Sequence, residues 1–77
     1  MTYGDALWRL KDGRAVCRTG WNGRGMYLFM IATWDYRDPR HGGRPTLPFI
    51  AMKTVDGSVV PWLCSQTDAL AEDWQEA

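Results

Sequence analysis

Apolar residues near the N-terminus recur at the spacing of one helical face. Ala6, Leu7 and Leu10 fall on this face, and residues 2–5 have the form of a capping box with Asp at its fourth position. An Asp-Gly pair follows at positions 12 and 13, and such a pair commonly ends a helix. The pattern predicts a helix over residues 3–11.

The next apolar runs predict two strands, over residues 14–18 and 26–31. The second run, Met-Tyr-Leu-Phe-Met-Ile, is apolar at every position, whereas a half-buried strand alternates apolar and polar residues. Both faces of this strand are therefore expected to be covered. Because a chain of 77 residues has little with which to cover the second face, we expect a homo-oligomer. The alternative is a central strand within a monomer.

The second half of the chain predicts a hairpin and a helix after a long loop. Residues 33–48 are rich in Arg, Gly and Pro without periodicity, which is typical of a loop. Apolar runs at 47–54 and 58–63 flank Asp56-Gly57, a strong hairpin signal. Pro61 indicates that the later strand is an edge or carries a bulge.

A final helix is predicted to begin in residues 65–68. Leu70 and Trp74 lie four residues apart and would face the sheet, while Glu72 and Asp73 would lie on the solvated face. The fold class is therefore α+β: a small antiparallel sheet of about four strands, with an N-terminal and a C-terminal helix packed on it. We expect a single domain over residues 1–77, with 33–48 as its long loop.

Charge and cysteine content narrow the function. Nine basic and nine acidic residues give zero net charge, which argues against binding a nucleic acid polymer. Two cysteines do not make a disulfide framework, and neither a signal peptide nor a membrane-spanning run is evident, so a cytoplasmic protein without membrane contact is expected. Six arginines lie within residues 14–44 and four acidic residues within 68–76, so a local basic pocket for a small phosphate ligand remains open.

The glycine-rich stretch of residues 18–25 carries the candidate chemistry. Trp21 offers a flat apolar face for stacking, Asn22 offers an amide, and Arg18 and Arg24 offer positive charge. Most of the five tryptophans are expected in the core of so small a domain. The glycine spacing matches neither the dinucleotide-binding fingerprint nor a P-loop, so the motif alone is weak.

Other chemistry is sparse. The start of the final helix, residues 65–68, offers backbone N–H groups suited to an anion, although Asp68 is also explained as a helix cap. His41 is the only histidine, and Cys17 and Cys64 lack the spacing of a zinc site. We expect no catalytic residue, no metal and no cofactor, which favours capture of a ligand over its turnover.

Three motifs in order carry a resemblance to a known family. They are Gly-Trp-Asn-Gly-x-Gly-Met-x-Leu at residues 20–28, Met-Lys-Thr-x-Asp-Gly at 52–57, and Pro-Trp-x-x-Ser-Gln-Thr-Asp-x-Leu-Ala-x-Asp-Trp at 61–74. This set resembles a compact phage and prophage domain family that includes the second type of Thoeris anti-defence protein. The resemblance covers nearly the whole chain apart from residues 33–48, where the sequence departs from the pattern.

The resemblance implies a molecular sponge. Such proteins sequester the cyclic ADP-ribose isomer made by bacterial TIR immune enzymes, glycocyclic ADP-ribose, without cleaving it, and some members also hold cyclic dinucleotides. It further implies a homotetramer with ligand pockets between subunits, acting in the cytoplasm of an infected bacterial host cell. Matched to the motifs, and with Arg18 and Arg24 added on their charge, the predicted ligand-binding residues are Arg18, Trp21, Asn22, Gly23, Arg24, Met26, Ser65, Gln66, Thr67 and Asp68.

Two alternatives remain. The chain is an enzyme that degrades such a nucleotide, using His41 or Asp68, or it is a non-catalytic oligomeric interaction module in which Trp21 is a contact residue.

Overall fold

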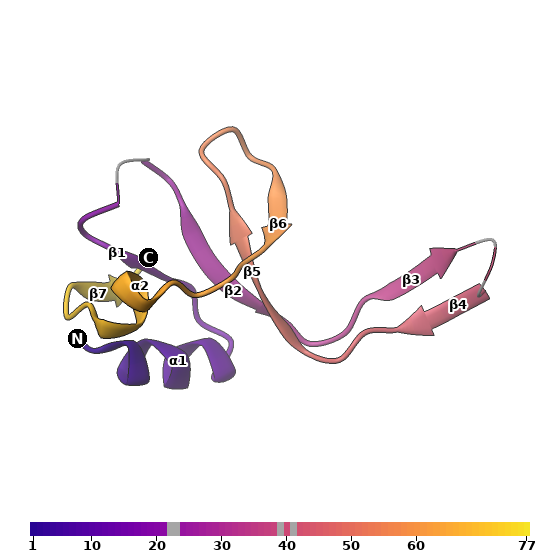
Figure 1. Cartoon of the computed structure of the whole chain (residues 1–77), viewed down its shortest axis with the longest axis horizontal. Coiled ribbons are helices and arrows are strands. Elements are labelled where there is room, and N and C mark those ends of the chain that lie inside the picture. The colour runs from indigo at the N-terminus through magenta and orange to yellow at the C-terminus, as the bar shows by residue number, and fades with distance from the viewer. Residues whose placement is uncertain (22–23, 39, 41) are drawn as a thin grey trace.

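The computed structural model describes residues 1–21, 24–38, 40 and 42–77. Within these residues, two helices and seven strands follow one another in sequence (Figure 1). They are α1 (Tyr3–Lys11), β1 (Val16–Arg18), β2 (Tyr27–Ile31), β3 (Asp35–Asp38), β4 (Gly42–Pro45), β5 (Phe49–Lys53), β6 (Val59–Pro61), α2 (Gln66–Leu70) and β7 (Trp74–Glu76).

The body of the molecule is an antiparallel five-stranded sheet with the order β6-β5-β2-β1-β7. Helix α1 packs against β1, β2 and β7, and α2 lies beside α1 near the β7 end (Figure 1). This arrangement confirms the α+β class predicted from the sequence. The sheet has five strands rather than about four, because the last residues of the chain form β7 alongside β1.

The core lies between α1 and the sheet. Ala6 and Leu10 on one face of α1 meet Val16 of β1 and Leu28 of β2, which are direct neighbours across the two strands, and Trp74 of β7 closes the cluster. All five residues are buried. The apolar spacing that predicts the helix is thus the spacing that fills the core.

The predicted helix over residues 3–11 is confirmed together with its capping box. The Thr2 hydroxyl accepts from the Asp5 backbone N–H at 3.3 Å, and the Asp5 carboxylate accepts from the Thr2 backbone N–H at 3.2 Å. The chain turns away after Lys11 through Gly13, whose φ of 85° suits glycine.

The predicted hairpin around Asp56-Gly57 is also confirmed. It joins β5 to β6, with Gly57 at a φ of 90° and the Thr54 N–H donating to the Ser58 carbonyl at 2.8 Å. Pro61 lies in β6, which is an edge strand as the sequence predicts.

The prediction that Trp74 lies on the final helix is wrong. Helix α2 spans only Gln66–Leu70, because Ala71 adopts extended backbone angles of φ −70° and ψ 151°. Leu70 is exposed, and Trp74 is buried from the strand β7. The four-residue spacing of Leu70 and Trp74 therefore does not reflect a shared helical face.

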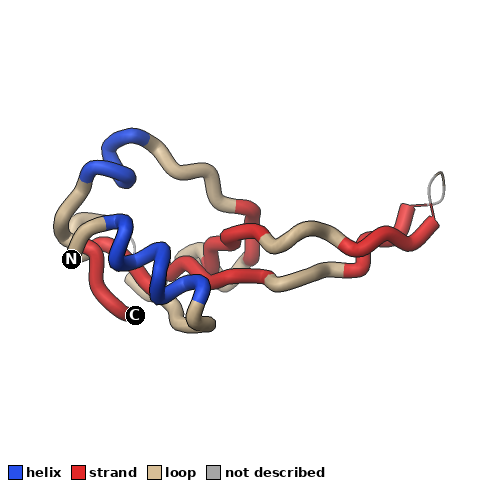
Figure 2. Tube along the Cα trace, turned by 90° about the horizontal axis from the view of Figure 1, so that it is seen from below, coloured by secondary structure: helices blue, strands red, loops and turns tan. Residues whose placement is uncertain are grey.

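Residues 33–48, expected as a loop without regular structure, contain a two-stranded ribbon. Strand β3 pairs antiparallel with β4 in the register Tyr36↔Arg44, and Gly42 has a φ of 72°. Figures 1 and 2 show this ribbon as an arm that continues from β2 and β5 and extends away from the body. Between body and arm, the Thr46 N–H donates to the Trp34 carbonyl at 2.8 Å.

Strand β2 is fully buried only at Leu28, and its other four residues are half-buried. Large apolar side chains are also exposed elsewhere: Trp8, Trp34, Leu47, Val55, Val59, Val60, Leu63 and Leu70. The predicted homo-oligomer stays a prediction. No helix among the described residues has the length and apolar character needed to cross a bilayer.

Candidate functional site

Arg18, the last residue of β1, holds two carboxylates at once. Its Nε lies 2.7 Å from Asp73 Oδ1, and its Nη1 lies 2.7 Å from Asp68 Oδ1. The side chains of Arg18 and Asp68 are each only 17% exposed, and that of Asp73 is 34% exposed. Asp68 comes from α2 and Asp73 from the turn before β7. We call these three side chains the loop anchor.

The loop anchor fixes the start of the glycine-rich loop. Asp73 Oδ2 accepts from the Gly20 backbone N–H at 2.8 Å, and the Asp73 carbonyl accepts from the Thr19 N–H at 3.1 Å and the Thr19 hydroxyl at 2.9 Å. Asp68 Oδ1 accepts from the indole Nε1 of Trp21 at 3.3 Å. The first residues of the loop are thus tied to segments some fifty positions away in the sequence.

Glycine is favoured at position 20 because the Asp73 carboxylate closely approaches the backbone there. A Cβ atom at this position would lie 2.9 Å from Asp73 Oδ2, closer than real Cβ contacts. The absent side chain lets the carboxylate reach the backbone N–H.

Trp21 packs against the aromatic part of the core. Its ring meets that of Trp74 edge-on, with centroids 5.5 Å apart and planes at 79°. Tyr3 and Trp62 complete the aromatic group around Trp74. Trp21 itself is half-buried, so the residue keeps some contact with solvent. Trp62 and Trp74 therefore belong to the core region, and Trp21, the predicted ligand contact, also packs against it, whereas Trp8 and Trp34 are exposed.

The other end of the loop carries positive charge. Gly25 has a φ of 76°, and its carbonyl accepts from Lys53 Nζ at 3.0 Å. The same ammonium lies 5.5 Å from the centroid of the Tyr27 ring. Arg24 precedes Gly25 and is exposed. Two carboxylates, those of Asp68 and Asp73, therefore contact the start of the loop, and two cationic side chains, those of Lys53 and Arg24, lie at its end.

The start of α2 does not offer the open anion site expected from the sequence. Ser65 is the N-cap, and its hydroxyl accepts from the Asp68 N–H at 3.1 Å while donating to Asp68 Oδ2 at 3.0 Å. A carboxylate already lies at this helix end, and α2 is five residues long. Gln66 and Thr67 are exposed on it.

Both anchor carboxyls are stronger acids than usual. Hydrogen bonding to Arg18 is the main cause that lowers the pKa of Asp73. Burial raises the pKa of Asp68, but hydrogen bonds from Arg18, Trp21 and Ser65 outweigh it, so that this pKa is also lowered. The same pairing raises the pKa of Arg18. All three groups are charged at neutral pH, and the loop anchor carries one net negative charge.

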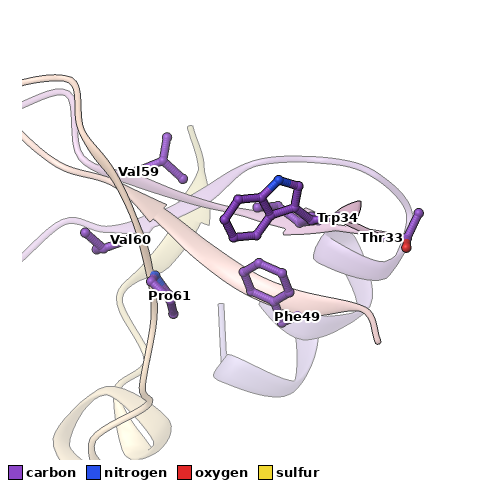
Figure 3. A pocket seen from close by; sticks show the side chains of 7 residues that line it. Thr33, Trp34, Phe49, Val59, Val60 and Pro61 are labelled. Atoms are coloured by element: carbon purple, nitrogen blue, oxygen red, sulfur yellow. The ribbon is translucent and has the colours of Figure 1, made fainter. Parts of the chain in front are cut away.

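Two hollows lie away from the loop anchor. One of about 340 Å³ sits where the arm leaves the body, and Figure 3 shows the rings of Trp34 and Phe49 beside the edge strand β6. It is lined by Ile31, Thr33, Trp34, Phe49, Val59, Val60 and Pro61. The other, of about 520 Å³, is lined by Met26, Met52, Thr54, Val55, Asp56, Ser58 and Val60. Neither of them is lined by Trp21.

The structure thus brings together four predicted ligand-binding residues: Arg18, Trp21, Ser65 and Asp68. Arg24 lies at the far end of the same loop, and Met26 lines a separate hollow. Asn22 and Gly23, like His41, lie outside the described residues.

Sequence reasoning missed Asp73, which it placed on the solvated face of a helix. Asp73 lies within the third motif, two residues after Ala71 and directly before Trp74. This position was the signal in the sequence that could have indicated its role. Among the residues that the structure describes, no group of three or more His, Cys, Asp or Glu side chains is placed to hold a metal ion.

Comparison with known proteins gives two findings. All of residues 1–77 match the family model described as Tad2-like, the Thoeris anti-defense 2-like domain. The chain is also 38% identical over 81 residues to the protein named Thoeris anti-defense 2 of Bacillus phage SP01. That alignment covers 96% of this chain and 91% of the phage protein.

Proposed function

Since the chain belongs to the Thoeris anti-defense 2-like family, we propose that it binds a cyclic nucleotide immune signal and holds it intact. Family membership itself supports an anti-defence role in phage. The ligand that we propose is glycocyclic ADP-ribose made by TIR enzymes, with cyclic dinucleotides as further candidates. Binding removes the signal from the cytoplasm of the infected cell before it reaches its effector.

The main observation in support of this proposal is how the side chain of Trp21 is held. Its ring is held by an edge contact to Trp74 and by an indole hydrogen bond to Asp68, yet it is only half-buried. A rigid aromatic face on a glycine-rich loop suits stacking on a nucleobase, since little side-chain entropy is lost on binding. Arg24 at the other end of the loop suits a phosphate group.

The state of the carboxyl groups favours capture over turnover. Asp68 and Asp73 have lowered pKa values and hold Arg18 between them. A general acid or base works best with a pKa near the operating pH, and these two groups are moved further from it. They therefore suit a structural role better than proton transfer, which supports a protein that binds without cleaving.

The exposed apolar surface supports a homotetramer, which remains part of this proposal. Leu63 is 92% exposed and Val59 is 56% exposed, and the apolar hollow beside β6 is open to solvent. Monomeric proteins rarely leave large apolar patches uncovered. Further copies of the chain would cover these surfaces, and ligand pockets between subunits would place Trp21 against a neighbour.

Recovery of the ligand tests the proposal. Glycocyclic ADP-ribose is incubated with excess protein, free ligand is measured by chromatography, and the protein is then denatured by heat. We expect free ligand to disappear and to return unchanged on heating. Recovery of a cleaved product in place of the intact ligand would instead support the degrading enzyme, and ligand that stays free throughout would contradict binding.

The variant Trp21→Ala tests whether the ligand binds at the proposed site, and Trp8→Ala is its matched control. Trp8 is an exposed tryptophan on α1, so its loss removes an indole without touching the loop. We expect Trp21→Ala to leave the ligand free while Trp8→Ala captures it. If Trp21→Ala captured ligand but no longer assembled, the interaction module would be supported.

A further inference from the structure

We infer that Asp73 is the positioning residue that holds the start of the glycine-rich loop, residues 18–21, in its ligand-binding shape. This inference rests on the proposed function and identifies the residue that prepares its site. Asp73 acts through Arg18, Thr19 and Gly20, the three residues that lead directly into Trp21, and needs no contact with the ligand itself.

The contacts of Asp73 divide between its side chain and its backbone. The carboxylate accepts from Arg18 Nε at 2.7 Å and from the Gly20 N–H at 2.8 Å. The backbone carbonyl accepts from Thr19 through both its N–H and its hydroxyl. Three consecutive loop residues are therefore bound by one residue, 53 to 55 positions away in the sequence.

The position of Asp73 makes it a rigid support. The next residue, Trp74, is 2% exposed and belongs to the core, and it pairs with Arg18 in the β1–β7 ladder. Asp73 and Trp74 together hold both parts of the loop: Asp73 fixes the backbone up to Gly20, and Trp74 supports the ring of Trp21. Loop and core thus meet at two adjacent residues.

A loop fixed before the ligand arrives binds more tightly than one that must be ordered by the ligand. The apparent dissociation constant rises in inverse proportion to the fraction of molecules in the competent conformation. In Asp73→Asn an amide NH2 group, which cannot accept, replaces one carboxylate oxygen, so the Gly20 N–H and Arg18 Nε are left with a single neutral acceptor between them. The competent fraction then falls, although the ring that contacts the ligand is unchanged.

Arg18 then has a structural role in place of the predicted contact with the ligand. The sequence predicts that this residue contacts ligand phosphate, but its guanidinium is shared by two carboxylates and is mostly buried. Since the loop anchor carries a net negative charge, a phosphate group placed there would be repelled. Arg18 therefore acts as a link between Asp73, Asp68 and the loop.

The test compares Asp73→Asn with Glu76→Gln. Glu76 is a matched control, because it also lies at β7 and pairs with an arginine, Arg14, at 2.8 Å, yet it does not contact the loop. Both variants lose one carboxylate charge: Asp73→Asn loses the ion pair with Arg18, and Glu76→Gln loses those with Arg9 and Arg14. Gly20→Ala serves as a second variant, because its Cβ displaces the same carboxylate from the loop side.

Two readouts are taken well below the melting temperature of each variant. The first is solvent exchange of the Gly20 amide and the Trp21 indole N–H by NMR, in protein without ligand. The second is the dissociation constant for glycocyclic ADP-ribose by calorimetry. A merely structural role would lower the melting temperature of Asp73→Asn and Glu76→Gln alike and would leave both readouts unchanged in the folded protein.

We expect Asp73→Asn and Gly20→Ala to speed exchange of the backbone amide of residue 20 and to weaken binding by about tenfold, while Glu76→Gln matches the wild type in both readouts. Wild-type affinity in folded Asp73→Asn, with the wild type binding normally, would overturn the inference and leave the proposed function standing. A wild type that binds no cyclic nucleotide would overturn the proposed function, and this inference with it. If Asp73→Asn does not fold, Gly20→Ala decides by the same two readouts.

Discussion

The indole N–H of Trp21 donates to the carboxylate of Asp68 at 3.3 Å, across 47 residues of sequence. This bond and the edge contact to Trp74 fix the orientation of the ring, so the polar edge of the indole is used within the chain. The accessible part of the ring is then left for stacking. Recognition of a nucleotide at Trp21 would therefore proceed through the aromatic surface, with polar contacts supplied by other groups.

Asp68→Ala is expected to lower the free energy of unfolding by about 1–3 kcal/mol, because it leaves the Trp21 indole N–H and one side of Arg18 without an acceptor in a largely buried place. Chemical denaturation measures this loss. Glu72→Ala is the matched control, since Glu72 is an exposed acidic residue in the same segment. Equal stability of the two variants would contradict the anchoring role of Asp68.

The stabilisation that Asp73 provides is expected to be present at neutral pH and to be lost at low pH. Arg18 holds the pKa of Asp73 below its ordinary value of 3.8, so the folded chain has a stronger acid than the unfolded chain. The unfolded state therefore takes up the proton first as pH falls, and the stabilisation that is complete above pH 3.8 is lost as pH falls through the folded pKa. Melting curves from neutral pH down to strongly acidic pH test this. In Asp73→Asn the acid-induced loss should be smaller than in the wild type, and an identical pH profile would contradict the pairing.

Arg24→Ala is expected to weaken binding of glycocyclic ADP-ribose by roughly tenfold or more, and to reduce its dependence on salt, because a charge-assisted hydrogen bond to phosphate is lost. Lys11→Ala, which removes an exposed cation at the end of α1, should bind as the wild type does. Calorimetric titrations at two salt concentrations compare the variants. If Lys11→Ala and Arg24→Ala behaved alike, the phosphate would not lie at this end of the loop.

Val59→Lys is expected to dissociate the proposed homotetramer. Val59 lies on the edge strand β6 and lines the apolar hollow, so a lysine would place a charge in the surface that other copies are proposed to cover. Leu70→Lys on α2 is the control, because Leu70 is also exposed but lies outside this hollow. Sedimentation analysis gives the mass of each variant. A wild type that sediments as a monomer would contradict the tetramer, and a Val59→Lys tetramer would contradict this interface.

Local patterns predict the elements that form from neighbouring residues. The capping box at Thr2 and Asp5 and the Asp56-Gly57 turn both specify short-range hydrogen bonds, and the structure contains both. Strand β7 could not be predicted in this way, because Trp74 is placed by pairing with Arg18, more than fifty residues earlier. The four-residue spacing of Leu70 and Trp74 indicated a helix instead of this strand pairing.

The arm was missed for a similar reason. Strands β3 and β4 continue from β2 and β5, whose register brings Ile31 opposite Phe49 and so delivers the two segments side by side. Nothing in the Gly- and Arg-rich sequence of β4 alternates, so periodicity gives no sign of a strand. The candidate site, too, could be predicted from local sequence only in part. Its aromatic and glycine residues were evident from sequence, whereas the partners of Arg18 became evident only through the tertiary structure.

Calorimetric titration of glycocyclic ADP-ribose into the wild type and into Trp21→Ala, with the mass of each protein measured alongside, shows whether Trp21 holds the ligand. We expect saturable binding to the wild type and no measurable binding to Trp21→Ala at an unchanged mass. Equal binding by both proteins would contradict this expectation, as would a wild type that releases no heat of binding at any ligand concentration.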